Sequence, residues 1–255
     1  MRACILCFFL LTASVSCQTA DEALTFEIAS VKLHVSQPGK STSSSLRGGP
    51  GTDDPGRIVA TNRLLRGLII DAWGIRNFQI EHPPWMAEKR YDIVAKVPAG
   101  ATKPQARAMM RNLLTRRFAL EVCREERPLP VYDLTVGKGG LKMKANDESV
   151  GPPQPDSVRM ETTGHDGKLT VQRQTLSRMV TMLTEFLDRP VINRTGLQGR
   201  YDYTVTFSYE PGPGADFQNE LAIAFQQQTG LKLNTRKEPV KMLIVVSARQ
   251  VPTEN

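Results

Sequence analysis

Apolar side chains recur along the chain at two spacings, which predict helices and strands. From residue 64 to 73, apolar residues return every three or four positions, which predicts a helix that Gly74 ends. From 91 to 97, every second residue is apolar, which predicts a strand with one buried face. The same patterns predict helices at 104–117, 176–187 and 217–229, and strands at 26–33, 57–61, 118–124, 131–136, 158–162, 168–171, 190–193, 201–209, 231–235 and 241–247.

Much of this pattern occurs twice, 111 residues apart. Leu65 matches Leu176, and Pro128 matches Pro239. Such self-similarity indicates two copies of one structural unit, and residues present in both copies are expected to serve folding. The tripeptide Arg-Tyr-Asp also recurs, one residue out of step, as Arg90, Tyr91 and Asp92 and again as Arg200, Tyr201 and Asp202.

Each copy is predicted to run strand, helix, strand, helix, strand, strand. We therefore expect an α+β fold of two tandem copies, with helices packed on a mainly antiparallel or mixed sheet. Asn62 is expected to cap the first helix, and Pro128 and Pro239 are expected to turn the chain between two short strands. The predicted parts are a signal peptide at 1–20, the first copy at 21–145 with a mobile loop at 36–56, a proline-rich linker at 146–155 and the second copy at 156–255.

The N-terminus has the pattern of an export signal. Arg2 supplies a positive charge, and residues 3–15 are almost wholly apolar or small but too few to span a bilayer. Cleavage near Cys17 or Ala20 would give a secreted or periplasmic protein. A lipoprotein acylated at Cys17 is the second interpretation, because Ser14 stands where an aliphatic residue is usual. No later stretch is long and apolar enough to predict a transmembrane helix.

The composition indicates a basic protein with a real core. Hydrophobic residues make up 40% of the chain, the formal net charge is +7 and the pI is about 9.4. This charge permits anionic partners but does not select one. Three of the four cysteines, Cys4, Cys7 and Cys17, lie in the export signal. Only Cys123 remains in the mature protein, so no intramolecular disulfide framework is expected.

The sequence carries no recognisable pattern for catalysis, metal binding or a cofactor. His34, His82 and His165 are far apart, and none stands in a spacing typical of metal ligands. No nucleophile motif of the Gly-x-Ser-x-Gly or Ser-x-x-Lys type occurs. Cys123 falls in a predicted strand, away from the helix N-terminus or base that would activate a thiol. Catalytic residues, metal ligands and cofactors are therefore not expected.

Asp92 and Asp202 are the obvious pair of carboxylates for acid–base chemistry. Both occur in the repeated tripeptide, at the start of a predicted strand. A pair that determines the fold should appear in both copies, whereas a catalytic pair need not. We therefore interpret the tripeptide as a folding signal, in which Arg and Asp share one face of the strand and pair across it.

Three features remain as candidates for ligand contact, the first of which is the predicted mobile loop at 36–56. The helix at 104–117 and its start carry basic residues one turn apart, of which Arg107 and Arg111 are the central pair. This face lacks the interleaved aromatic residues of single-strand binding surfaces, so nucleic acid is not an expected partner. The turn from His82 to Trp85 holds two prolines and could present an exposed indole. Equally, Trp85 could fasten this turn to the core.

The chain resembles a bacterial family of uncharacterised secreted proteins, largely acidobacterial and soil-associated, defined by a domain of unknown function. Residues 26–32, 113–120, 124–132, 137–140, 189–202 and 230–233 carry the resemblance. It implies an exported protein without an assigned reaction. In some relatives a similar domain is attached to membrane-bound metallopeptidase sensors, which implies sensing or binding. Residues 176–199 are also faintly similar to the short N-terminal domain of secretins and TonB-dependent receptors.

These observations favour a non-catalytic extracytoplasmic binding or sensor module. The alternatives are a secreted hydrolase acting on an envelope or extracellular polymer, and a structural component of the envelope. The partner is unknown; a cell-envelope polymer, a peptide or an envelope protein is the candidate. The features that the two copies do not share are the expected location of a specific function.

Overall fold

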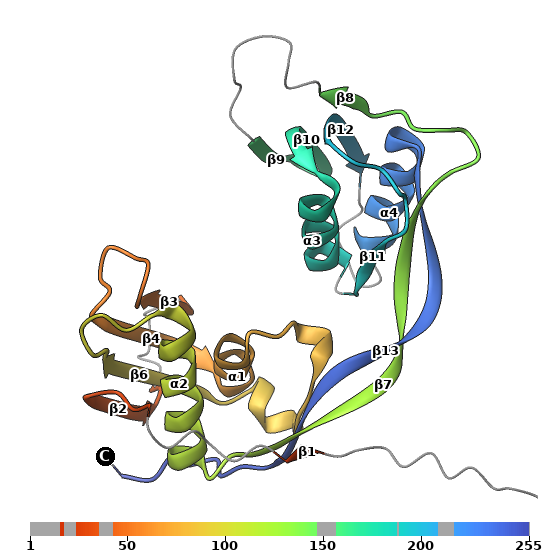
Figure 1. Ribbon diagram of the computed structural model, residues 1–255. Coiled ribbons are helices and arrows are strands. Elements are labelled where there is room, and N and C mark those ends of the chain that lie inside the picture. Colours follow the sequence, from red (N-terminus) through yellow and green to blue (C-terminus); the bar gives the residue numbers. More distant parts are fainter. Residues whose placement is uncertain are drawn as a thin grey trace, which may run out of the picture. The chain divides into compact units, whose positions relative to one another are not determined.

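The chain forms two compact units in the computed structural model (Figure 1). Unit 1 comprises Met1–Arg127 and Val240–Asn255, and unit 2 comprises Pro128–Pro239. The structure describes residues 16–17, 24–35, 43–146, 157–187, 189–208 and 217–254. Of the expected signal peptide at 1–20, the structure describes only residues 16–17. Of the expected linker at 146–155, it describes only Asn146. The units divide at the two repeated prolines, whereas the sequence suggested a division at 146–155.

Unit 1 is built on a four-stranded antiparallel sheet in the order β2-β6-β4-β3. Helices α1 and α2 contribute to the apolar core that lies against this sheet (Figure 1). The elements are β2 (Ile28–Leu33), β3 (Ser45–Gly48), β4 (Arg57–Leu64), α1 (Leu65–Trp73), η1 (Asn77–Gln79), β5 (Ile80–Glu81), η2 (Pro84–Ala87), β6 (Arg90–Lys96) and α2 (Lys103–Phe118).

Unit 2 has a four-stranded antiparallel sheet with the corresponding order, β8-β12-β10-β9. Its core draws on helices α3 and α4 in the same way. The predicted α+β class is confirmed, and no helix among the described residues is long and apolar enough to cross a membrane. The elements are β8 (Lys144–Asn146), β9 (Ser157–Thr163), β10 (Asp166–Thr175), α3 (Leu176–Leu187), β11 (Val191–Asn193), β12 (Arg200–Ser208) and α4 (Phe217–Thr229).

Two long strands, β7 (Glu121–Val136) and β13 (Leu231–Ser247), begin in one unit and end in the other. They are hydrogen-bonded neighbours (Figure 1). In unit 1, β5 pairs in parallel with the second half of β13, and in unit 2, β11 pairs in parallel with the second half of β7. A short strand, β1 (Ser16–Cys17), also pairs with β7.

The repeated prolines do not turn the chain, so that prediction was wrong. Pro128 and Pro239 lie inside the continuous strands β7 and β13, at the positions where the chain passes from one unit to the other. Proline's fixed φ near −65° is compatible with an extended backbone, and only its missing N–H weakens a ladder. Each copy therefore ends in one long strand rather than in a hairpin.

The expected cap of the first helix was also wrong. Asn62 lies within β4 with φ 54°, and α1 begins three residues later behind Leu64, without a side-chain cap. Gly74 does end α1, in the left-handed conformation expected of a helix stop. In the segment predicted to be a mobile loop, Ser45–Gly48 forms β3 and pairs with β4. The sequence did not predict β3 because four residues are too few to show an alternation of apolar and polar side chains.

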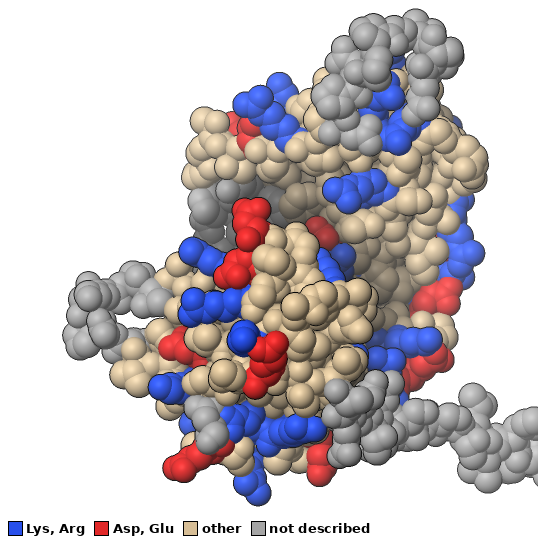
Figure 2. All heavy atoms as spheres, turned by 60° about the vertical axis from the view of Figure 1, so that its left-hand side comes forward, with Lys and Arg blue, Asp and Glu red and all other residues tan. Residues whose placement is uncertain are grey.

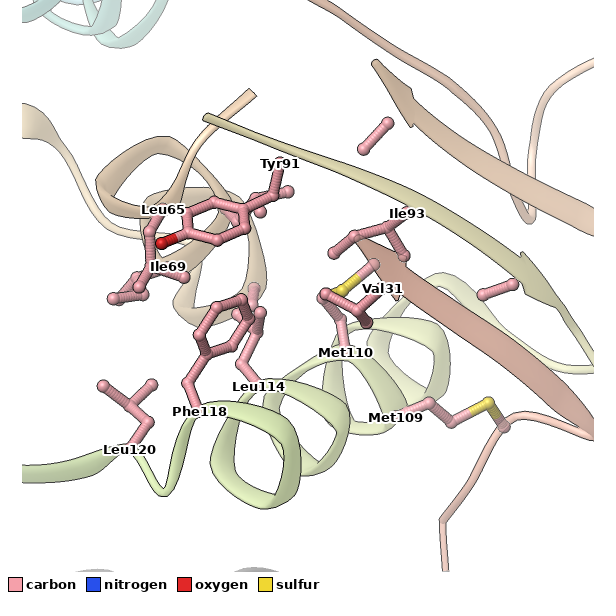
Figure 3. Packing of buried hydrophobic residues seen from close by; sticks show 14 of the residues in the cluster. Val31, Leu65, Ile69, Tyr91, Ile93, Met109, Met110, Leu114, Phe118 and Leu120 are labelled. Atoms are coloured by element: carbon pink, nitrogen blue, oxygen red, sulfur yellow. The ribbon is translucent and has the colours of Figure 1, made fainter. Parts of the chain in front are cut away.

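The core of unit 1 centres on two aromatic rings. Tyr91 and Phe118 meet edge to face, with ring centroids 4.9 Å apart and an interplanar angle of 83°. Leu65 and Ile69 from α1 approach the same rings (Figure 3). The Tyr91 hydroxyl donates to the carbonyl of Gln250 at 2.8 Å, which ties the C-terminal segment to this core.

Replacing Tyr91 with phenylalanine should flatten the loss of stability at alkaline pH. Burial raises the pKa of the Tyr91 phenol from 10.0 to about 12, so between these values the unfolded chain loses a proton that the folded protein keeps. The contribution of this group is therefore complete below pH 10 and is lost as the pH rises toward 12. Urea unfolding at a series of pH values from 9 to 12 should show a shallower decline for Tyr91→Phe than for the native protein. Parallel declines would contradict this assignment.

Candidate functional site

The first repeated Arg-Tyr-Asp tripeptide holds a β-bulge in unit 1. The register between β4 and β6 shifts between Ala60 and Arg63, and Asn62 adopts a left-handed backbone there. The backbone N–H of Asn62 donates to Asp92 Oδ1 at 2.8 Å, and Arg90 Nη1 donates to the Asn62 carbonyl at 2.9 Å. The two charged side chains thus hold both peptide groups of one strained residue.

The second tripeptide holds the matching bulge in unit 2. The register between β10 and β12 shifts between Val171 and Gln174, and Arg173 has φ 56°. The Arg173 N–H donates to Asp202 Oδ1 at 2.7 Å, and Arg200 Nη1 donates to the Arg173 carbonyl at 2.7 Å. The expected pairing of Arg with Asp across the strand is therefore replaced by contacts from both side chains to the backbone of the neighbouring strand.

The second oxygen of each carboxylate is bound by an equivalent neighbour. His34 Nδ1 lies 3.0 Å from Asp92 Oδ2 and 2.9 Å from Oδ1, and its side chain is 8% exposed. In unit 2, Asn146 Nδ2 donates to Asp202 Oδ2 at 2.9 Å. Both residues belong to the edge strand region beside β6 or β12. The Asn146 amide binds the carboxylate in unit 2 as the His34 imidazole does in unit 1, so this contact does not require an imidazole. The geometry therefore supports a folding role for His34 and for both aspartates.

Unit 1 contains a groove of about 700 Å³, which we call the unit-1 groove. Residues 48–52, residues 74–77 at the end of α1, and the first two turns of α2 line it. Ile58, Leu68 and Met110 supply apolar surface. The volume is within the range of small-ligand and peptide sites. The groove therefore combines an apolar surface with a glycine-rich loop in which Gly51 is exposed.

The charges of the unit-1 groove are mostly positive. Arg76, Lys103 and Arg107 are exposed and line it. The carboxylate in the lining, Asp71, is engaged by Arg63 in an ion pair. A capping box in which Gln105 N–H donates to Thr102 Oγ1 starts α2 and positions its first turn. Asp71, the acidic residue in the groove lining, is therefore already paired with Arg63 and does not neutralise the cations of the groove.

Arg111 lies behind this groove and supports its wall. Its Nη1 donates to the carbonyl of Ala72 at 2.9 Å, at the C-terminal end of α1. Burial lowers the pKa of the Arg111 guanidinium, and the positive charges of Arg124 and Arg107 lower it further. On the face shown in Figure 2, Lys and Arg are interspersed with Asp and Glu. Arg111 thus lies close enough to Arg107 and Arg124 to be affected by their positive charges.

The structure separates the four predicted contact residues. Arg107 lines the groove, and its guanidinium lies over Gly74, where an added Cβ would come within 3.2 Å of Nη1. Trp85 is half-buried against the core of unit 1, and His82 Nδ1 lies 2.9 Å from the Pro83 carbonyl. His82 and Trp85 are outside the groove lining, and their role in binding stays a prediction. The Gly-Gly-Pro-Gly run at 48–51 belongs to the loop at 36–56, which the sequence predicts to be mobile and a candidate for ligand contact, and residues 48–52 of it line the groove.

Unit 2 has a groove of about 610 Å³ with different chemistry. Glu161, Asp166 and Glu220 line it, with Lys168 as a cation. Ser208 donates to Asp166 Oδ1 at 2.6 Å, so part of this acidic surface is already engaged. Among the residues that the structure describes, no group of three or more His, Cys, Asp or Glu side chains could hold a metal ion. Unit 2 also has a smaller groove of about 380 Å³ lined by Lys138, Lys142 and Lys232, so what distinguishes the unit-1 groove is its combination of cations with an apolar surface.

Comparison with known proteins gives a family but no activity. Neither the curated proteins nor the solved structures gave a match. The family model described as "Protein of unknown function (DUF3738)" matches residues 66–248, from α1 of unit 1 to the end of β13. The matched region contains both tripeptides and the α2 side of the groove, whereas the 48–52 loop lies before it. Because the match covers well over half of the chain, the protein belongs to the DUF3738 family.

Proposed function

We propose that this protein is a non-catalytic extracytoplasmic binding module whose ligand carries negative charge and occupies the unit-1 groove. The observation that carries the proposal is the meeting of Arg76, Lys103 and Arg107 above an apolar surface. Opposite charges steer association and select among ligands, and the apolar contacts add affinity. The signal-like N-terminus supports a location outside the cytoplasm.

We also infer that the two units are copies of one ancestral unit. The equal strand orders and the two Arg–Asp bulge contacts support this inference. Under this correspondence, Arg107 matches Gln218, 111 residues later. Folding therefore does not require positive charge at this position, and Arg107 is better explained by binding.

Reversing one groove charge should weaken binding of an amphipathic anion. The probe is 8-anilinonaphthalene-1-sulfonate, a fluorescent sulfonate with apolar rings. Arg107→Glu should raise its Kd about tenfold, which corresponds to about 1.4 kcal/mol. Arg116→Glu makes the same charge change at an exposed position of α2 outside the groove and should raise the Kd less than about twofold.

Methyl NMR spectra of the same samples should locate the probe. Resonances of Ile58 and Met110 in the groove should shift on titration, while that of Met179, buried in unit 2, should not. Equal losses of affinity in Arg107→Glu and Arg116→Glu, or shifts confined to Met179, would rule out the proposed site.

A further inference from the structure

We infer that the ligand of the unit-1 groove is an extended peptide with acidic side chains at alternate positions. This inference rests on the proposed function and specifies the chemistry of the ligand. It is motivated by three properties of the groove: the spacing of its cations, the exposed Gly51 in the loop that lines it, and the apolar surface that Ile58, Leu68 and Met110 supply.

The spacing of the cations matches an extended chain. Lys103 and Arg107 stand one turn apart on α2, and such residues are separated by about 5–6 Å between Cβ atoms. Alternate residues of a strand lie about 6.6 Å apart and point to the same side. Two acidic side chains separated by one residue can therefore reach Lys103 and Arg107 together. A compact anion with a single charge cannot use both positions in this way.

The 48–52 loop that lines the groove contains three glycines. Gly48, Gly49 and Gly51 all have positive φ, and a Cβ added at Gly51 would meet no other atom within 4 Å. The turn is held by Gly49 N–H to the Asp54 carbonyl at 2.9 Å and by Thr52 Oγ1 to the Gly49 carbonyl at 2.8 Å. A ligand main chain can approach this loop closely at Gly51, which is exposed and carries no side chain.

The base of the groove suits an aliphatic side chain next to the acidic ones. Ile58 and Leu68 are buried core residues that reach this surface, and Met110 is a flexible side chain that adapts to different shapes. An acidic peptide with one aliphatic residue would thus contact all three parts of the groove. Arg76 at the end of α1 provides a further cation for a longer segment.

The test compares peptides of equal composition. A short acetylated, fluorescein-labelled peptide has three glutamates at alternate positions and one leucine, and its isomer has the same glutamates in one block. By fluorescence anisotropy, the alternating peptide should bind at least about fivefold more tightly than the isomer, which corresponds to about 1 kcal/mol. Its binding should weaken about tenfold in Arg107→Glu and less than about twofold in Arg116→Glu.

The outcomes separate this inference from the proposed function. Equal binding of the two isomers would show attraction by charge alone and would overturn the peptide assignment. If the sulfonate probe binds in an Arg107-dependent manner but neither peptide does, the peptide inference fails while the anion groove stands. If neither probe nor peptide responds to Arg107→Glu, both proposals fail. Selective, Arg107-dependent binding of the alternating peptide would support both.

Discussion

Replacing Gly230 with alanine should lower the free energy of unfolding by about 2–5 kcal/mol. Gly230 follows α4 with φ 76°, where a residue with a Cβ loses about 1–2 kcal/mol. In addition, the new Cβ would lie 2.1 Å from the carbonyl oxygen of Gly140, a backbone atom that cannot rotate away. Moving the segments of Gly230 and Gly140 apart to relieve this contact adds about 1–3 kcal/mol to the loss. Urea unfolding followed by circular dichroism measures the change.

Gly100 provides a matched control for this prediction. It has the same φ of 76°, but an added Cβ would meet no atom within 4 Å. Gly100→Ala should therefore lose only the backbone part, about 1 kcal/mol. Ala119, which follows α2, is left-handed at φ 45°, so a residue with a Cβ is tolerated in this conformation after a helix. Equal losses in Gly230→Ala and Gly100→Ala would refute the predicted steric conflict.

Removing either clamping carboxylate should destabilise the protein by about 1–3 kcal/mol. Asp92→Ala leaves the N–H of Asn62 without its acceptor at 2.8 Å, and Asp202→Ala does the same to Arg173 at 2.7 Å. An unsatisfied donor that is partly buried loses this much relative to a bonded one. Asn62 and Arg173 also have a left-handed backbone, which these hydrogen bonds stabilise. Hydrogen exchange of β4 and β10 amides should locate each loss in its own unit.

The asparagine variants separate the hydrogen bond from the charge. Asp92→Asn and Asp202→Asn keep an amide oxygen that can accept the bulge N–H, so each should retain at least half of the stability that its alanine variant loses. The double alanine variant should lose about the sum of the single losses, because the two bulges share no partner. Alanine variants as stable as the native protein would contradict the clamp at both positions.

Local patterns predicted most of the regular elements. The apolar stripe at 176–187 gave the bounds of α3, and the stretch at 217–229 gave those of α4. Gly74 and Gly230 end their helices as expected. These features depend on residues within a few positions of each other, so sequence spacing is enough to reveal them.

The errors concern residues whose partners are far away in the chain. Asn62 has the side chain of a helix cap, but Asp92 and Arg90 hold its backbone in a bulge. Proline is typical of turns, but β7 and β13 stay extended through Pro128 and Pro239 because they pair with neighbouring strands of one sheet. Local propensity is a weak preference, and contacts with distant strands override it.

The sequence by itself determined the α+β class, the order of helices and strands, and the doubling of the Arg-Tyr-Asp signal, because periodicity and turn residues are local properties. Only the tertiary structure decided that Arg107 faces Gly74 and shares a groove with Arg76 and residues 48–52. It also decided that the two aspartates hold backbone bulges. These arrangements join segments that are distant in sequence, and the packing of strands and helices, rather than any spacing along the chain, brings their side chains together.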